Sequence, residues 1–268
     1  KPDITTKEKL VNTTWRISYP NENTVYKTTA KVLYSDSRLK ENEFLRLGYD
    51  DSNWKYYSRQ DENNIKSIYG YWRMNIPVGA KSVVVPSYML GKEIWLNDKK
   101  IKVTDSLINL APESKLLSFV INRKEEKITV APFKFTVGTK ENQKLASWYT
   151  YGLQQYSGFL EYETSITIDD TSSNVFIDLG EVKYMAEVFV NDQPAGARLW
   201  PPFKFDISNT LKPGENKIKI KIGNLIANEM WMKEDMGKLR TWGWRGIPDL
   251  NQYGAGLFGP VKLVFISK

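Results

Sequence analysis

A segment near the carboxyl end of the chain, from Asn228 to Tyr253, combines tryptophans, arginines and carboxylates within a short stretch. Sugar rings present apolar C–H faces that stack on aromatic side chains, and their hydroxyls exchange hydrogen bonds with charged and amide groups. Long insertions between strands of a compact domain are commonly functional, so this composition favours carbohydrate binding. The residues expected to contact sugar here are Trp231, Arg240, Trp242, Trp244, Arg245 and Asp249.

A structural interpretation of this segment remains open. Its tryptophans would then pack onto the rest of the chain or onto a separate domain, because a large aromatic side chain stabilises packing as readily as it binds sugar. A second aromatic group begins at Trp148, and we expect Tyr149 and Tyr151 within it to be exposed and to contact sugar. The residue types alone do not decide between sugar binding and domain packing.

Paired carboxylates raise the question of catalysis. Hydrolysis of a glycosidic bond uses two carboxyl groups about 5 to 9.5 Å apart. Glu161 and Glu163 alternate along a predicted strand and so share one face, at a spacing of about 7 Å, although a solvated strand face explains this pair equally well. The other carboxylates considered for this chemistry are Glu229, Glu234 and Asp235.

The composition excludes several kinds of catalytic and metal site. The chain has 268 residues with no histidine and no cysteine, which excludes Ser-His-Asp triads, cysteine nucleophiles, zinc fingers and disulfides. A bound cation would be one that prefers oxygen ligands, such as calcium. No compact Asp-x-Asp-x-Asp loop is present, so the sequence identifies no metal ligands.

The charge pattern favours neither a nucleic-acid nor a membrane partner. Lysine plus arginine number 38 and aspartate plus glutamate 31, a formal net charge of +7. The lysines at 217, 219 and 221 alternate with isoleucines, which is typical of one solvated strand face. No segment reaches the roughly 18 apolar residues of a membrane span. Because the chain begins with Lys1 and not with methionine, we expect a mature form or a fragment of a longer protein.

Most of the chain consists of short runs that alternate between apolar and polar residues, which predicts β-strands separated by turns. Two runs form a repeat, because Glu93 to Asp98 and Glu187 to Asp192 begin 94 residues apart and both end in Asn-Asp. Asn-Asp tolerates the positive φ of a tight hairpin. We therefore expect an all-β protein with two β-sandwich domains, at residues 1–137 and 138–268.

An ordered series of motifs runs through the second half of the chain, over about residues 145 to 268. Its members are Trp148 to Gly158, Phe176 to Gly180, Ala186 to Asp192, Pro194 to Gly196, Trp200 to Asp206, Leu211 to Asn216, Asn224 to Asn228 and Gly256 to Val261. The series resembles the C-terminal β-sandwich of large bacterial glycoside hydrolases, most closely the α-L-rhamnosidase-like enzymes of family 106. It is also similar to the sugar-binding domain of glycoside hydrolase family 2. The first half resembles the same module more loosely, through Tyr71 to Pro77 and Trp95 to Asp98.

The resemblance implies that both domains are jelly rolls of the galactose-binding-like type, which often carry a structural calcium ion. It also implies that the catalytic carboxylates lie in a separate barrel domain, for which two sandwiches leave no room. We therefore expect a non-catalytic region of a secreted or periplasmic bacterial glycoside hydrolase. Its expected partners are a poly- or oligosaccharide and the catalytic domain of a parent enzyme, with no cofactor. Two alternatives remain open: a small free-standing glycosidase with a carboxylate pair, and a purely structural interaction module.

Overall fold

The computed structural model describes residues 6–11, 14–20, 23–27, 30–57, 65–126, 132–169, 173–226, 228 and 254–267. Nearly all of its regular elements are antiparallel strands, so the expected all-β fold is confirmed. The internal contacts divide the chain into two compact units. Unit 1 comprises the described parts of residues 1–21, 139–150 and 156–268, and unit 2 comprises those of residues 22–138 and 151–155.

The two units are not consecutive halves of the chain. β1 (Thr6–Leu10) pairs with β23 (Lys262–Ile266), and β2 (Trp15–Ser18) pairs with β15 (Phe159–Ile168). Strands near the amino end therefore belong to unit 1, and unit 2 is inserted between β2 and β13 (Lys140–Gln143). The chain enters unit 2 at residue 22 and returns to unit 1 at residue 139.

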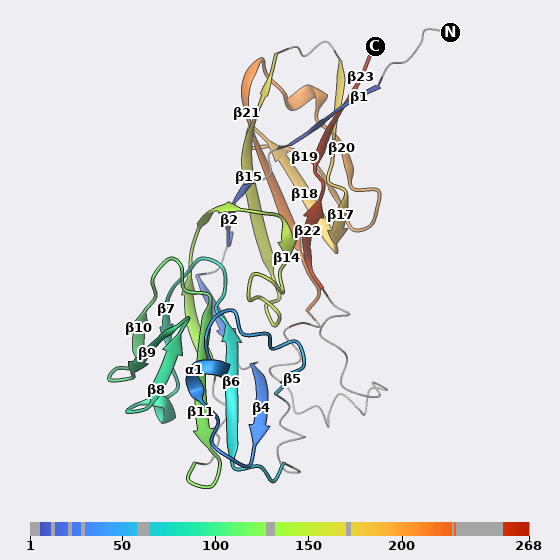
Figure 1. Ribbon diagram of the computed structural model, residues 1–268. Helices are drawn as coiled ribbons and strands as arrows, with labels where there is room; N and C mark the ends of the chain where they lie inside the picture. Colours follow the sequence, from blue (N-terminus) through green and yellow to red (C-terminus); the bar gives the residue numbers. More distant parts are fainter. Residues whose placement is uncertain are drawn as a thin grey trace. The chain divides into compact units, whose positions relative to one another are not determined.

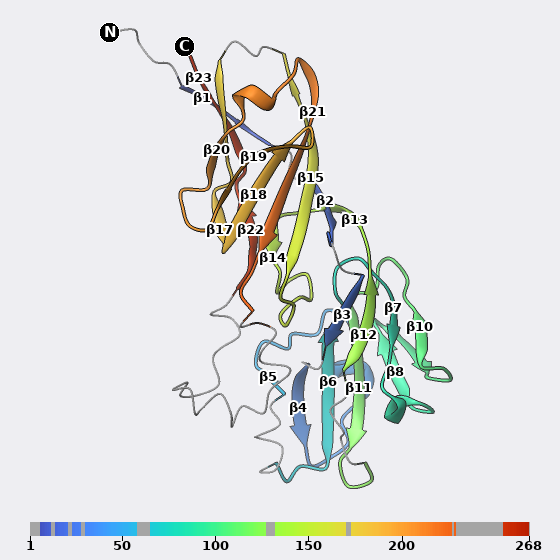
Figure 2. The ribbon, with the colours of Figure 1, turned by 180° about the vertical axis from the view of Figure 1, so that it is seen from behind.

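Unit 1 contains three sheets, and both views show β1 running beside β23 (Figures 1 and 2). Their strand orders are β13-β2-β15-β21-β18-β19, β1-β23-β16-β20 and β14-β22-β17. The remaining elements of this unit are β14 (Ala146–Ser147), β16 (Asn174–Asp178), β17 (Glu181–Lys183), β18 (Met185–Val190), β19 (Gln193–Arg198), β20 (Lys204–Asp206), a 3₁₀ turn (Ser208–Thr210), β21 (Gly214–Gly223) and β22 (Gly256–Gly259).

Strict alternation along β21 builds one wall of the core of unit 1. Ile218, Ile220 and Ile222 are fully buried, while the lysines between them lie on the opposite face. Successive side chains of a strand point to opposite faces. The expectation that the lysines form one solvated face of this strand is therefore confirmed. On the neighbouring β15, the buried hydroxyl of Tyr162 accepts a 2.8 Å hydrogen bond from the indole N–H of buried Trp148. This bond satisfies a polar group that would otherwise be buried without a partner.

Unit 2 contains two sheets, with the orders β10-β7-β12-β3 and β5-β4-β6-β11-β8-β9. The first of these sheets can be followed in Figure 2. The elements of this unit are β3 (Thr24–Lys27), β4 (Lys31–Ser35), α1 (Glu41–Phe44), β5 (Lys55–Tyr56), β6 (Tyr69–Asn75), β7 (Ala80–Val84), a 3₁₀ turn (Ser87–Met89), β8 (Glu93–Leu96), β9 (Lys99–Lys102), β10 (Leu107–Asn109), β11 (Leu116–Asn122) and β12 (Phe133–Val137).

Aromatic rings join the two sheets of unit 2. Phe119 on β11 stacks on Phe133 of β12 with ring centroids 5.8 Å apart, and Trp72 on β6 stacks on the other side of Phe119 at 5.8 Å. All three side chains are buried. Because β11 and β12 belong to different sheets, these rings fill the space between the sheets and define which face of each sheet points inward.

The hairpins expected at the two Asn-Asp sequences are both present, one in each unit. The β8–β9 hairpin turns at Asn97 with a φ of 52°, and the β18–β19 hairpin turns at Asn191 and Asp192 with φ values of 52° and 63°. Asparagine and aspartate adopt these left-handed conformations more readily than other side chains. The repeat seen in the sequence is thus a repeat of a two-residue hairpin loop, with a positive φ at both loop residues in unit 1 and at Asn97 alone in unit 2.

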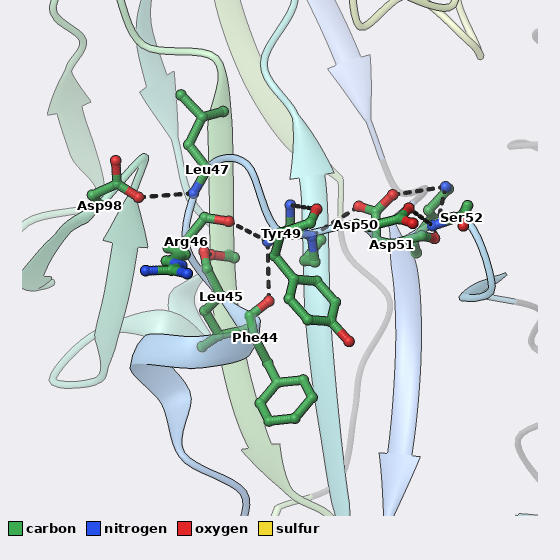
Figure 3. A network of polar contacts seen from close by, with 12 residues as sticks. Phe44, Leu45, Arg46, Leu47, Tyr49, Asp50, Asp51, Ser52 and Asp98 are labelled. Atoms are coloured by element: carbon green, nitrogen blue, oxygen red, sulfur yellow. Dashed lines mark hydrogen bonds and ion pairs between the residues drawn. The ribbon is translucent and has the colours of Figure 1, made fainter.

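A buried arginine holds a long loop of unit 2 in place. Arg73 on β6 bonds the carboxylate of Asp51 at 2.8 Å and donates to the backbone carbonyls of Phe44, Arg46 and Tyr49. These partners come from one stretch of chain that folds back on itself, as Figure 3 shows for its labelled residues. Burial raises the pKa of Asp51, but its hydrogen bonds with Lys31 and Arg73 outweigh burial and leave the pKa below its usual range. The network orders the loop and uses four of the five N–H bonds of the guanidinium.

A buried lysine attaches residues 151–155 to unit 2. The ammonium of Lys27 donates to the carbonyl oxygens of Asn75 and Gly152, both at 2.6 Å, and to Oε1 of Gln154 at 3.0 Å. Three acceptors match the three N–H bonds of an ammonium group, so the geometry suits the charged form. Burial opposes this and lowers the pKa of Lys27 to about 7. The result is a polar anchor that closes one part of the unit 2 core.

Candidate functional site

Most of the residues that the sequence marks for sugar contact lie outside the described residues: Trp231, Arg240, Trp242, Trp244, Arg245 and Asp249. The two tyrosines of the set are described. Tyr149 is half-buried, but the expectation that Tyr151 is exposed is wrong, because its side chain is 7% exposed. The main chain places it there, since its carbonyl accepts a hydrogen bond from the N–H of Val78 within unit 2. A ring buried to this degree offers no face for stacking on a sugar.

A polar hollow of about 600 Å³ lies on unit 1. Its lining is dominated by charged, amide and hydroxyl side chains. The lining residues are Thr14, Trp15, Arg16, Glu141, Asn142, Glu163, Thr164, Ser165, Asn191, Lys212, Glu215 and Lys217. A lining of this kind suits a ligand rich in hydroxyl groups, because such a ligand both donates and accepts hydrogen bonds.

The six-stranded sheet brings these residues together from distant parts of the sequence. β2 pairs with β15, and the register places Arg16 directly opposite Glu163. β21 pairs with β15 on the other side and carries Lys217, while β13 pairs with β2 and carries Glu141. Side chains of neighbouring strands on one face lie within reach of each other. The hollow therefore depends on strands from both sides of the inserted unit 2.

Three ion pairs connect the charges of the hollow in a row. Arg16 bonds Glu141 at 3.1 Å and Glu163 at 2.8 Å, and Lys217 bonds the other oxygen of Glu163 at 2.9 Å. The Glu163 side chain is 11% exposed, so it is more enclosed than the solvated strand face considered from the sequence. Hydrogen bonding to Glu163 raises the pKa of Lys217, although this lysine is largely exposed.

This arrangement suits binding better than glycosidic hydrolysis. Hydrolysis uses one carboxyl group as an acid and a second, opposite it, as base or nucleophile. Glu141 and Glu163 are instead both engaged by Arg16, and Glu163 also by Lys217. Trp15 also lines the hollow, but its side chain is only 1% exposed, and its indole nitrogen is buried without a hydrogen-bond partner among the described residues. Glu141 and Glu163 therefore act as hydrogen-bond acceptors that are already held in place.

Sequence reasoning identified Glu163 but missed the residues around it. Arg16 and Glu141 are 147 and 22 residues away from Glu163 along the chain and belong to different strands. Only the strand register brings these three side chains together, and no local pattern encodes that register. Lys217 was noticed as part of a lysine row, and its pairing with Glu163 is likewise a product of the register.

Two searches of the described residues gave negative results. No group of three or more aspartate, glutamate, histidine or cysteine side chains in that part of the chain is arranged to hold a metal ion. Within the same residues, no helix is long and apolar enough to cross a membrane. Calcium binding stays a prediction from the resemblance.

Comparison with known proteins gives one sequence relative and several structural neighbours. No protein-family model matches the chain. A protein of Formosa agariphila named "Putative beta-glucuronidase" is 30% identical over 102 residues, which are 35% of this chain and 9% of that protein. The match thus spans less than a tenth of the length of this relative.

The structural neighbours include glycoside hydrolases. One is a rhamnosidase from Novosphingobium sp. PP1Y, with 14% identity, a TM-score of 0.40, and coverage of 74% of this chain and 22% of that one. Another is a β-glucuronidase from an uncultured Clostridium sp., with 14% identity, a TM-score of 0.37, and coverage of 98% and 29%. At these scores, neither likeness bears on the substrate or activity of this chain.

Proposed function

We propose that this chain is a non-catalytic, carbohydrate-associated region of a bacterial glycoside hydrolase that binds polysaccharide and braces a separate catalytic domain. The observation that carries this proposal is the row of ion pairs in the hollow, which leaves hydrogen-bonding groups for a polar ligand and engages Glu141 and Glu163. The relative from Formosa agariphila, whose printed name refers to a glucuronidase, supports a carbohydrate-related role. We also propose that the protein is secreted or periplasmic.

The finer parts of the proposal rest on the sequence. Both units would be jelly rolls of the galactose-binding-like type, with room for a structural calcium ion. The aromatic and charged segment after Asn228 would supply the sugar-contacting side chains, because tryptophan faces and arginine or aspartate hydrogen bonds are what a sugar requires. Trp242 and Trp244 are the residues chosen for testing.

Binding of oligosaccharides to the purified chain tests this function. We expect the Trp242→Ala, Trp244→Ala double variant to weaken binding in titration calorimetry, provided that circular dichroism shows it to be folded. Unchanged binding by the folded variant would remove the sugar-contact role of these tryptophans. Turnover of aryl glycosides by the wild-type chain, lost in Glu163→Gln, would instead support the free-standing glycosidase.

A bracing role is favoured by a second observation on unit 1. Leu199 and Trp200, between β19 and β20, are 60% and 70% exposed, and Pro201 and Pro202 follow them. Adjacent exposed apolar side chains next to conformationally restricted prolines are suited to docking against another protein surface. If Trp200→Ala weakens association with a separately produced catalytic domain but leaves oligosaccharide binding unchanged, bracing and sugar binding use different surfaces.

A further inference from the structure

The solvent-facing side of the sheet β10-β7-β12-β3 in unit 2 carries an ordered set of side chains. The register aligns Leu107 with Val84, Val84 with Lys134, and Lys134 with Tyr26, so these residues form one row across all four strands. Each is exposed: Tyr26 by 48%, Val84 by 37% and Leu107 by 50%, with Lys134 exposed as well. We call this set the apolar row.

A second row lies one side-chain step along the same face. The same register aligns Asn109 with Ser82, Ser82 with Thr136, and Thr136 with Thr24. Side chains two residues apart on a strand share a face, so this polar row runs parallel to the apolar row. The residues between them, among them Val83 and Phe135, are buried in the core, which fixes the two rows on the outside.

The chemistry of the two rows is complementary to a chain of sugars. The ring of Tyr26 and the side chains of Val84 and Leu107 offer apolar surface for the C–H faces of sugar rings. The polar row offers hydroxyl and amide groups that both donate and accept hydrogen bonds, as sugar hydroxyls do. Stacking surface and hydrogen-bonding groups thus run side by side along one direction.

We call the apolar row and the polar row together the platform. Lys134 is the charged residue among the eight that form it. The ammonium of Lys134 lies 5.9 Å from the centre of the Tyr26 ring, and Lys134 makes no ion pair within the described residues. At the rim, Asp105 is bonded to its own loop, where it accepts hydrogen bonds from the N–H of Leu107 and the hydroxyl of Ser106. Among the described residues of the two rows, Lys134 is thus a cation that a carboxylate of the ligand could pair with.

The two rows alone are smaller than a stable protein interface. Four strands at about 4.8 Å spacing span about 14 Å, and two rows are about 7 Å apart, which gives an area of the order of 100 Å². A stable protein interface buries about 800 Å² on each partner. A strip of this width accommodates a few sugar units lying across the strands.

We propose that this face of unit 2 binds a uronate-bearing polysaccharide, with sugar rings on the apolar row, hydroxyls on the polar row and a carboxylate at Lys134. This inference rests on the proposed carbohydrate association and specifies a surface and a substrate class for it. The residues of this surface belong to unit 2 and are not among those that line the hollow of unit 1.

Titration of the full chain with a galacturonate hexamer, and with a neutral galactose oligomer of the same length, tests the proposal. We expect Tyr26→Ala to weaken galacturonate binding about five- to tenfold through loss of ring stacking. Lys134→Gln should weaken it about two- to fivefold and remove its salt dependence. Tyr26→Phe keeps the ring and Lys99→Gln removes a charge elsewhere on unit 2, so both controls should bind like the wild type.

Each other outcome has a defined meaning. If the wild type binds galacturonate but Tyr26→Ala and Lys134→Gln bind equally well, the proposal that the platform binds sugar is overturned and the proposed function stands. The Trp242 and Trp244 double variant would then locate the site. If the wild type binds no glycan, the proposed function itself fails. A preference for a sulfated oligomer overturns the uronate assignment. A dimer that Tyr26→Ala dissociates in size-exclusion chromatography would identify a second copy of this chain as the occupant.

Discussion

Asn97 and Asn191, 94 residues apart, make an equivalent pair of hydrogen bonds to a neighbouring strand, one in each unit of this protein. The N–H of Asn97 donates to the carbonyl of Leu116 at 2.8 Å, and its Oδ1 accepts from the N–H of Leu116 at 3.1 Å. The N–H of Asn191 donates to the carbonyl of Lys217 at 2.9 Å, and its Oδ1 accepts from the N–H of Lys217 at 3.1 Å. In each unit, therefore, the hairpin asparagine is clamped to a neighbouring strand, which supports a duplicated architecture.

The equivalence predicts matched losses of stability. Asn97→Ala and Asn191→Ala each force alanine into a left-handed conformation and remove the side-chain acceptor, so we expect about 2 kcal/mol of destabilisation in either unit. Replacement by glycine restores the conformational freedom and should cost less than replacement by alanine. Urea unfolding measures the loss, and amide hydrogen exchange at Leu116 and Lys217 reports the broken clamp. Equal stability of the alanine and glycine variants would contradict the conformational part of this argument.

Removal of the buried guanidinium of Arg73 should be far more costly than removal of an exposed one. Arg73→Met leaves Asp51 with one of its two cations and three backbone carbonyls without their donor, and we expect a loss of about 3–5 kcal/mol. The matched control is Arg38→Met, which removes an ion pair with Glu41 from a side chain that is 66% exposed. An exposed pair of this kind contributes about 0–1 kcal/mol. Similar midpoints of chemical denaturation for the two variants would show that Arg73 does not order its loop.

The stability cost of crowding at Gly152 can be measured separately from the cost of its backbone conformation. Gly152 has a φ of +73°, and a Cβ there would lie 2.5 Å from the carbonyl oxygen of Ile76. Gly48 has a similar φ of +86°, with nothing within 4 Å of a Cβ. Gly48→Ala should therefore cost about 1 kcal/mol for the conformation alone, and Gly152→Ala at least about 2 kcal/mol more for the clash. Thermal denaturation of both variants measures the difference, and equal losses would argue against a tight fit of residues 151–155.

The buried lysine makes the stability of unit 2 depend on pH. Folding lowers the pKa of Lys27 to about 7 from its ordinary value of 10.5. Between these values the unfolded chain holds the additional proton, so the free energy of unfolding rises with pH across the window, by up to about 1.4 kcal/mol per pH unit. Lys27→Met should lack this contribution. The measurement is the difference in unfolding free energy between wild type and variant from about pH 7 to about pH 10, and a constant difference would mean that Lys27 keeps its proton throughout.

Local patterns in the sequence predicted the strands, the hairpins, and which face of a strand is buried and which is exposed to solvent. The alternation along residues 217–222 and the Asn-Asp turns are encoded within a few residues, and these features are present where expected. The insertion of unit 2 could not be predicted in this way. It depends on β2 pairing with β15 across more than a hundred intervening residues, and nothing in the short β2 segment specifies its partner.

The candidate sites show the same limit. Tyr151 was expected to be exposed, but the anchoring of residues 151–155 within unit 2 buries it. The hollow around Glu163 and the platform around Lys134 are both assembled from different strands by register. Composition can identify the kind of side chain that binds sugar, whereas the pairing of strands decides which of them meet.

The insertion of unit 2 between two paired strands has a mechanical consequence. β2 pairs with both β13 and β15, so the strand that precedes unit 2 and the strand that follows it are joined directly within unit 1. A pulling force applied across β1 and β23 first unzips that terminal ladder, in which Thr6 and Ile266 are partners. As long as β2 and β13 hold together, tension passes through their ladder and bypasses residues 22–138. Unit 2 is thus an insert that stays folded while unit 1 bears the load.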